Sequence, residues 1–154
     1  MDFMLTEEQR QIRESIRRIC DEYGEDYWYK KDLNHEFPHE FARAFAAAGW
    51  FGAIFPEEIG GAGLGMTEAA IIMSEVGRNG FNGCSTLHMN MFGCQPIVKF
   101  GTKEQQRRFL PPIIAGTDRA CFGVTEPDAG IDTTHIRTFA ERRGDRYVVH
   151  GRKV

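Results

Sequence analysis

The residues whose types and spacing are most suggestive of chemistry lie in CFGVTEPDAGIDTT, residues 121–134. Pro127 favours an extended conformation at Glu126, and Gly130 can take a positive φ, so we expect the segment to bend. A bend leaves backbone N–H and C=O groups without strand partners, and Thr125 adds a hydroxyl that donates or accepts. Together these groups suit the hydrogen-bonding edge of a flat heterocycle, with Gly130 letting the backbone approach a phosphate. The alternative is an ordinary connection between a strand and a turn, and the residues alone favour it.

A second segment, HEFPH (35–39), matches the H-E-x-x-H pattern of zinc peptidases. That chemistry needs both histidines on one helical face, with Glu36 as the base. Pro38 disfavours helical geometry at Phe37, so the residues favour a loop in which Pro38 begins the next helix, and we expect no metal site. The cysteines are scattered without a C-x-x-C pair, which favours buried, reduced thiols. They are Cys20, Cys84, Cys94 and Cys121.

The glycine-rich stretch GGAGLG (60–65) has the composition of a phosphate-binding loop but not its register, because Met66 occupies the last glycine position of G-x-G-x-x-G. It also lacks a βαβ context and a lysine-serine pair, so we expect a flexible connection between helices. Met89, Met91 and Phe92 are compatible with an apolar ligand pocket, although such residues more often belong to a core.

The composition excludes several classes of protein. The chain has 154 residues, of which 42% are apolar, enough for one domain, or one domain and part of another, with a real core. Its 19 Lys and Arg against 22 Asp and Glu give a net charge of -3, without the basic surface of a nucleic-acid-binding protein. No apolar run approaches the roughly 18 residues of a membrane span, and residues 1–18 do not resemble a signal peptide. We therefore expect no nucleic-acid partner, no membrane span and no targeting segment.

Helices are expected over most of the chain before its strands. Thr6 with Gln9, and Thr102 with Gln105, form capping-box patterns that each open a helix. The helix after the second box, KEQQRRFL, should end at the prolines 111–112, because proline lacks the N–H that a helix interior needs. The first helix has one apolar face, which comprises Ile12, Ile16, Ile19, Cys20 and Tyr23. The other predicted helices cover 38–48, which Gly49 ends, about 67–76, and one or two short segments within 84–100 interrupted near Gly93 and Pro96.

After Gly116 the pattern changes from helices to strands. The predicted strands are ACFGVT (120–125), HIRTFAE (135–141) and RYVVH (146–150). A turn at 128–130 follows the first strand, and a hairpin turn at 143–145 joins the last two. The expected fold is mainly α, with a helical domain, 1–117, followed by the opening strands of a second domain, 118–154.

Several segments resemble one known family. FGVTEPDAGID (122–132) resembles the flavin-binding signature of acyl-CoA dehydrogenases, V-T-E-P-x-A-G-S-D. FPEEIGGAGLG (55–65) is similar to the loop between helices of the family's N-terminal domain. GTKEQQRRFLPPIIAGTDRACFGVTEP (101–127) is similar to the passage into its middle β domain, and GDRYVVHGRKV (144–154) to the hairpin beyond. The resemblance spans nearly the whole chain, in order and with family-like spacing.

The resemblance implies a fold and an activity. The fold would be a helical N-terminal domain, 1–117, followed by the first strands of a truncated β-barrel-like middle domain, 118–154. The intact enzyme would use FAD and remove a proton α to a thioester carbonyl while hydride leaves the β carbon. Its catalytic glutamate belongs to a C-terminal helical bundle in this family. The resemblance therefore implies no catalytic residue in this chain, which would be inactive on its own.

The resemblance also implies partners and a compartment. They are an acyl-CoA substrate, an electron-transferring flavoprotein, and further copies of the same chain in a dimer or tetramer. The protein would act in fatty acid metabolism, in a bacterial cytoplasm or the mitochondrial matrix. Two alternatives stay open: an acyl-CoA oxidase or flavin monooxygenase of the same superfamily, and a stand-alone helical interaction module.

The family's binding residues carry over to numbered positions of this chain. Thr125 would bond the pyrimidine side of the flavin ring. Ile131 stands where the family has a serine and lies beside the substrate's pantetheine arm, so the hydroxyl contact is lost, moved to Thr133 or Thr134, or made by backbone. The implied cofactor-binding residues are Phe122, Gly123, Val124, Thr125, Gly130 and Ile131. The residues implied beside the acyl chain are Ser85, Leu87, His88 and Met89.

Overall fold

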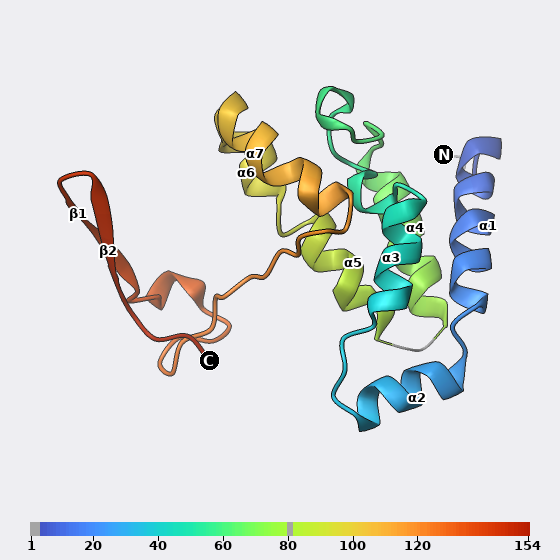
Figure 1. Ribbon diagram of the computed structural model, residues 1–154, viewed down its shortest axis with the longest axis horizontal. Helices are drawn as coiled ribbons and strands as arrows, with labels where there is room; N and C mark the ends of the chain where they lie inside the picture. The colour runs from blue at the N-terminus through green and yellow to red at the C-terminus, as the bar shows by residue number, and fades with distance from the viewer. Residues whose placement is uncertain (1–3, 80–81) are drawn as a thin grey trace. The chain divides into compact units, whose positions relative to one another are not determined.

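The computed structural model describes residues 4–79 and 82–154, which belong to two compact units, Met1–Cys121 and Phe122–Val154. The first unit is helical and the second contains an antiparallel hairpin (Figure 1). The prediction of a mainly α chain that ends in a few strands is therefore confirmed. None of the helices in the described residues combines the length and apolar character that a membrane span requires.

The first helix, α1 (Glu7–Asp21), begins where the sequence predicts. The Thr6 hydroxyl accepts a hydrogen bond from Gln9 N at 3.2 Å, and the Gln9 side chain accepts one from Thr6 N at 3.1 Å. These bonds complete the capping box. Ile16 is fully buried on the predicted apolar face, which packs alongside α4 (Met66–Arg78) (Figure 1). The predicted helix over 67–76 is thus confirmed and slightly longer.

A buried carboxylate joins these two helices. Glu75 of α4 is 5% exposed, and its carboxylate accepts hydrogen bonds from Arg17 Nε at 2.9 Å and from Arg78. Burial raises the pKa of Glu75, but the bonds from Arg17 and Arg78 outweigh burial and hold the pKa below its ordinary value. The side chain therefore stays charged and links α1 to α4.

Aromatic side chains fill the core of the helical unit. Phe41 and Phe45 of α3 (His39–Ala47) have ring centroids 4.6 Å apart. Trp28 of α2 (Glu25–Leu33) meets the Phe41 ring edge-on at 4.9 Å. The sequence pattern does not predict α2, because the apolar side chains of α2 do not recur at helical spacing.

The segment after α3 confirms two predictions and corrects one. α3 ends at Ala47, just before Gly49, whose φ of 79° is the left-handed conformation that glycine favours after a helix. The glycine-rich stretch 60–65 is a loop, as predicted, but it is tied down rather than flexible. Its N–H groups donate to carbonyls of the preceding turn: Ala62 to Gly52, Gly63 to Phe55 and Leu64 to Ala53. The turns beneath it are η1 (Trp50–Gly52) and η2 (Glu57–Ile59).

The two histidines of HEFPH do not share a helical face. His35 has a left-handed φ of 53°, and His39 is the first residue of α3, so Pro38 separates them as predicted. In residues 4–79 and 82–154, no group of three or more potential metal ligands gathers. The cysteines are free thiols, and Cys121 is exposed, contrary to the prediction of burial. It begins a stretch, 121–123, in which every residue is exposed.

The stretch 84–100 forms two short helices, as predicted. They are α5 (Gly83–Met91) and α6 (Gln95–Phe100), with the break around Gly93. Pro96 does not interrupt α6 but lies in its first turn, where a missing N–H leaves no helical bond unmade. Met91 is fully buried and belongs to the core rather than to a ligand pocket.

The last helix, α7 (Lys103–Ile114), begins at the predicted capping box of Thr102 and Gln105. The prediction that prolines 111–112 end it is wrong, because the helix continues through both. Leu110 and Ile113 are buried in a second apolar cluster, and this burial offsets the backbone bonds that the prolines cannot donate.

The second unit is built on the hairpin of β1 (Phe139–Arg143) and β2 (Arg146–His150). The predicted hairpin is confirmed, and its turn begins at Gly144 with a φ of 66°, as a two-residue loop requires. The predicted strand over 135–141 starts only at Phe139. His135 belongs to a short 3-10 turn, η3 (Thr133–His135), and the N–H groups of Arg137 and Thr138 donate to the Glu126 carboxylate rather than to a strand.

Two phenylalanines test where the core of the helical unit lies. Phe45 is fully buried, whereas Phe100 is 84% exposed at the end of α6. We expect Phe45→Ala to lower the free energy of unfolding by about 3–5 kcal/mol, because it leaves a cavity in the aromatic cluster. The control Phe100→Ala should change it by less than about 0.5 kcal/mol. Urea unfolding followed by circular dichroism measures both, and equal effects would contradict this core.

Candidate functional site

The segment 122–131 is a mostly exposed stretch of backbone in the second unit. The prediction that 120–125 forms a strand is wrong, because no described residue pairs with it in a ladder. Phe122 is 64% exposed and Ile131 is fully exposed, while Val124 is half-buried. The segment therefore presents backbone and side chains that the chain itself does not cover.

The predicted bend is present but lies one residue earlier than expected. Glu126 N donates to Ala129 O at 2.9 Å, and Ala129 N donates to Glu126 O at 3.2 Å. Pro127 and Asp128 form the turn between them. Because the turn closes at Ala129, Gly130 lies outside it and does not take the positive φ that we expected.

At Val124 and Thr125 the segment offers donors rather than acceptors to a ligand, whereas the Phe122 and Gly123 carbonyls have no donor among the described residues. Among the described residues, the N–H groups of 122–125 have no hydrogen-bond acceptor, and neither has the Thr125 hydroxyl. The Val124 and Thr125 carbonyls are already hydrogen-bonded. Val124 O accepts from Lys153 Nζ at 2.9 Å, and Thr125 O accepts from Val154 N at 3.1 Å. The N–H groups of 122–125 and the Thr125 hydroxyl are thus suited to a molecule whose edge carries hydrogen-bond acceptors.

The Glu126 side chain holds this segment against residues further along the chain, a role that the sequence did not predict. This side chain is 7% exposed, and its carboxylate accepts bonds from Arg137 N at 2.8 Å, Thr138 N at 3.0 Å and the Thr138 hydroxyl. Lys153 Nζ lies 3.0 Å from the same carboxylate. The bonds from the Thr138 hydroxyl, the Arg137 N–H and the Lys153 ammonium lower the pKa of Glu126 to about 2. A glutamate before proline gives no sequence signal for such partners.

The far end of the segment shows what replaces the signature's serine. Ile131 is fully exposed and has no hydroxyl. Thr134 is already engaged, because its N–H and its hydroxyl both donate to the Asp132 carboxylate. The Thr133 hydroxyl has no acceptor in the part of the chain that the structure describes. Thr133 and the backbone therefore remain as the available groups here.

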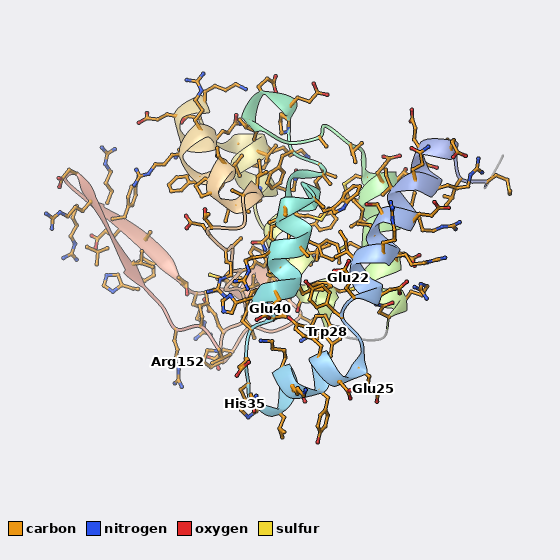
Figure 2. The ribbon with its side chains drawn as sticks, turned by 45° about the vertical axis from the view of Figure 1, so that its right-hand side comes forward. Glu22, Glu25, Trp28, His35, Glu40 and Arg152 are labelled. Carbon is orange, nitrogen blue, oxygen red and sulfur yellow. The ribbon has the colours of Figure 1, made fainter. Side chains whose placement is uncertain are left out.

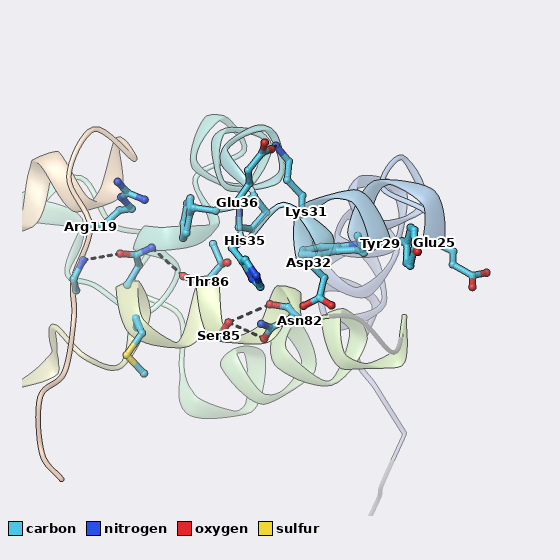
Figure 3. A pocket seen from close by; sticks show the side chains of 16 residues that line it. Glu25, Tyr29, Lys31, Asp32, His35, Glu36, Asn82, Ser85, Thr86 and Arg119 are labelled. Carbon is cyan, nitrogen blue, oxygen red and sulfur yellow. Dashed lines mark hydrogen bonds and ion pairs between the residues drawn. The ribbon is translucent and has the colours of Figure 1, made fainter. Parts of the chain in front are cut away.

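The helical unit carries a pocket of about 730 Å³ (Figure 3). Ser85 of α5 lines one wall, and Asp32 and His35, from α2 and the loop after it, line the opposite wall (Figure 3). Met89 of α5 also lines the pocket. The Ser85 hydroxyl donates to the side-chain oxygen of Asn82 at 2.9 Å. The pocket thus combines an apolar thioether with several polar groups.

Of the four residues implied beside an acyl chain, two line this pocket and two do not. Ser85 and Met89 lie four residues apart on α5 and line the pocket together. Leu87 is fully buried in the core, on the other side of the helix. His88 is exposed, with its ring 5.4 Å from that of Phe92, and does not line the pocket.

The wall formed by α2 was not anticipated, because α2 itself was not predicted. Figure 2 shows Trp28 within α2 and His35 just beyond its C-terminal end. Elsewhere in the pocket, the Arg119 guanidinium lies over the Phe37 ring at 4.4 Å. Asn90 fixes the neighbouring backbone, since its amide oxygen accepts from Ala120 N at 3.0 Å.

Comparison with known sequences identifies the family. A family model described as acyl-CoA dehydrogenase, N-terminal domain, matches residues 6–117. The probable acyl-CoA dehydrogenase YngJ of Bacillus subtilis (strain 168) is 36% identical over 154 residues, covering 99% of this chain and 40% of the relative. The helical unit is therefore an acyl-CoA dehydrogenase N-terminal domain. The chain belongs to the acyl-CoA dehydrogenase family.

Solved structures agree with this assignment. A glutaryl-coenzyme A dehydrogenase in complex with glutaryl-CoA matches with a TM-score of 0.91 and 30% identity, covering 98% of this chain and 39% of that chain. An acyl-CoA dehydrogenase from Bacillus anthracis complexed with FAD matches with a TM-score of 0.87 and 28% identity, covering 97% of this chain and 26% of that chain. The chain thus spans less than half the length of the relatives it matches.

The low pKa of Glu126 predicts how the segment responds to acid. Its pKa falls from the ordinary 4.5 to about 2, so its contribution to stability is complete above about 4.5 and is lost as pH falls toward 2. The amide resonances of Arg137 and Thr138, which donate to the carboxylate, should titrate with a midpoint near pH 2. This transition should be missing in Glu126→Gln. A midpoint near 4.5 would contradict the hydrogen bonding described for Glu126.

Proposed function

We propose that this chain forms the cofactor-facing N-terminal part of an FAD-dependent acyl-CoA dehydrogenase, which introduces a Cα–Cβ double bond into an acyl-CoA thioester. The observation that carries the proposal is the row of unpaired N–H donors at 122–125, within a segment that keeps the V-T-E-P-x-A-G part of the signature. We assign 1–117 to the helical N-terminal domain and 118–154 to the beginning of the middle β domain.

The residues of this segment fit a flavin. The pyrimidine side of the ring carries carbonyl oxygens that accept hydrogen bonds, and Thr125 offers both an N–H and a hydroxyl without an acceptor among the described residues. Phe122 adds an exposed aromatic face. A Cβ placed at Gly130 would meet no atom within 4 Å, so the space beside it is open to a pyrophosphate. The proposed cofactor-binding residues are Phe122, Gly123, Val124, Thr125, Gly130 and Ile131.

Bound FAD would supply the electron sink that accepts hydride from Cβ. The role of this chain would be to bind and orient the ring through the donors of 122–125. Removal of the Cα proton needs a base with an available lone pair. Glu126 does not qualify, because its carboxylate is engaged by several donors and its pKa is about 2. Glu126 is therefore not the base, and we assign the base to no residue of this chain.

We propose that the acyl-CoA substrate meets the chain at two places. Ile131 would lie beside the pantetheine arm, with the Thr133 hydroxyl or backbone N–H groups replacing the missing serine. Ser85 and Met89 would contact the acyl chain, because they already line a pocket with apolar and polar walls. His88 and the buried Leu87 complete the proposed set, with Leu87 acting by holding α5 in the core.

Our proposals for partners and compartment rest on family membership alone. We propose an electron-transferring flavoprotein as the electron acceptor and self-association into a dimer or tetramer. The protein would serve fatty acid metabolism in a bacterial cytoplasm or in the mitochondrial matrix. These assignments do not depend on the geometry of the segment 122–131.

Thr125→Val tests the proposed hydroxyl contact. The change keeps the side-chain shape and removes the donor, so FAD affinity should fall by a factor of about 2 to 10, since one such bond contributes about 0.5–1.5 kcal/mol. FAD titration of the chain, followed by the amide resonances of 122–131, measures the affinity. Thr117→Val is the matched control, because its hydroxyl donates to Pro112 O in the helical unit. An unchanged affinity for Thr125→Val would remove this hydroxyl from the flavin site.

By themselves, residues 1–154 should bind FAD only weakly and should not turn over. The two-stranded sheet of β1 and β2 has edges that no described strand covers, and such a sheet gives little independent stability. Titration with FAD and then with an acyl-CoA should give no stoichiometric yellow complex and no loss of flavin absorbance on adding substrate. A yellow protein that substrate bleaches would show that these residues suffice for the reaction.

A further inference from the structure

Lys153 is placed to control the direction of the peptide group that carries the Thr125 N–H. Its ammonium donates to Val124 O at 2.9 Å and lies 3.0 Å from the Glu126 carboxylate. In a trans peptide, the C=O and the N–H lie in one plane and point in opposite directions. The contact that holds the Val124 carbonyl toward Lys153 therefore points the Thr125 N–H away from Lys153.

Glu126 keeps Lys153 in that position. The carboxylate is 7% exposed and is fixed on its other side by Arg137 N at 2.8 Å and Thr138 N at 3.0 Å, just before β1. A carboxylate held by backbone donors is a rigid anchor, and its charge strengthens the hydrogen bond to a neighbouring ammonium. The Lys153 side chain is 34% exposed, so water screens this pair only in part.

No second side chain shares this task in the part of the chain that the structure describes. The backbone of 122–125 accepts one side-chain hydrogen bond there, from Lys153. The neighbouring contact, from Val154 N to Thr125 O at 3.1 Å, is made by backbone and holds the next peptide group. Removing the Lys153 ammonium would leave the Val124 carbonyl without a partner and the Thr125 peptide group free to turn.

We propose that Lys153, anchored by Glu126, is a positioning residue that aims the Thr125 N–H at the flavin. The inference rests on the proposed FAD contact at 122–131. Lys153 acts through the backbone and does not itself touch the cofactor. Lys153 narrows the range of orientations of the segment 122–125, so that a larger fraction of molecules holds the orientation that binds FAD.

The test is an FAD titration of the 154-residue chain, followed by the amide resonances of 122–131 and of the hairpin 139–150. In Lys153→Met, the FAD dissociation constant should rise about threefold to tenfold, because fewer molecules hold the binding orientation. Lys153→Arg keeps a charged donor and should restore affinity to within about twofold. Arg146→Met is the matched control, because Arg146 on β2 is 86% exposed and meets only Asp145, at 3.9 Å, among the described residues. Its FAD affinity should not change.

The possible outcomes separate this inference from the function on which it rests. Unchanged FAD affinity in Lys153→Met, with wild-type hairpin resonances, overturns the positioning role and leaves the flavin contact intact. No FAD-dependent shift at 122–131 in the unsubstituted chain overturns the flavin contact and the positioning role together. If Lys153→Met disturbs the hairpin, the same titration is made with Lys153→Ala. Weaker FAD binding by Lys153→Ala with an intact hairpin supports the positioning role. A disturbed hairpin in both variants shows that Lys153 has a structural role and overturns the positioning role.

Discussion

The candidate site depends on one requirement, that the nearly buried carboxylate of Glu126 be satisfied. A carboxylate removed from water must be hydrogen-bonded or paired, because an isolated buried charge costs far more than folding can supply. The groups that satisfy it come from residues 137–138 before β1 and from Lys153 after β2. Three segments far apart in sequence are thereby held together at one side chain. The bend of the signature is thus supported by the hairpin that follows it.

Glu75 and Glu126 show two uses of a buried carboxylate. Glu75 is bonded by the side chains of Arg17 and Arg78, so it links the packing of one helix to another. Glu126 is bonded by the Thr138 hydroxyl and Lys153 but also by two backbone N–H groups, which have fixed positions once the chain is folded. Side-chain partners can adjust their rotamers, whereas backbone partners cannot. Glu126 is therefore better suited to fixing the direction of a backbone segment, and Glu75 to stabilising a helix pair.

The sequence was informative wherever the decisive interaction is local. The capping boxes at Thr6 and Thr102, the stop at Gly49 and the hairpin turn at Gly144 depend on neighbouring residues, and the structure has all of them. The sequence failed where distant partners decide. Burial of Leu110 and Ile113 carries α7 through its prolines, and Trp28 is placed by the aromatic core rather than by a periodic pattern in α2. The strand predicted over 120–125 failed because a strand needs a partner that local sequence does not specify.

The same distinction applies to the candidate site. The bend could be predicted from the signature residues, but the partners of Glu126 could not, since they lie 11, 12 and 27 residues further along the chain. Of the residues implied beside an acyl chain, Ser85 and Met89 line the α5 side of the pocket. Its other wall depends on α2, whose existence follows from tertiary packing.

The surroundings of Ile131 show which groups could replace the serine hydroxyl of the family's signature. The bond from the Thr134 hydroxyl lowers the pKa of Asp132, so that hydroxyl is committed within the chain and does not substitute for the serine. Under the proposed function, a polar ligand group at this position would meet the Ile131 N–H or the Thr133 hydroxyl. The fully exposed isoleucine side chain adds apolar area that gains by contact with methylene groups. Under that proposal, the substitution would shift recognition at this position from a side-chain hydroxyl toward backbone donors and apolar contact, without removing the donors that the bend provides.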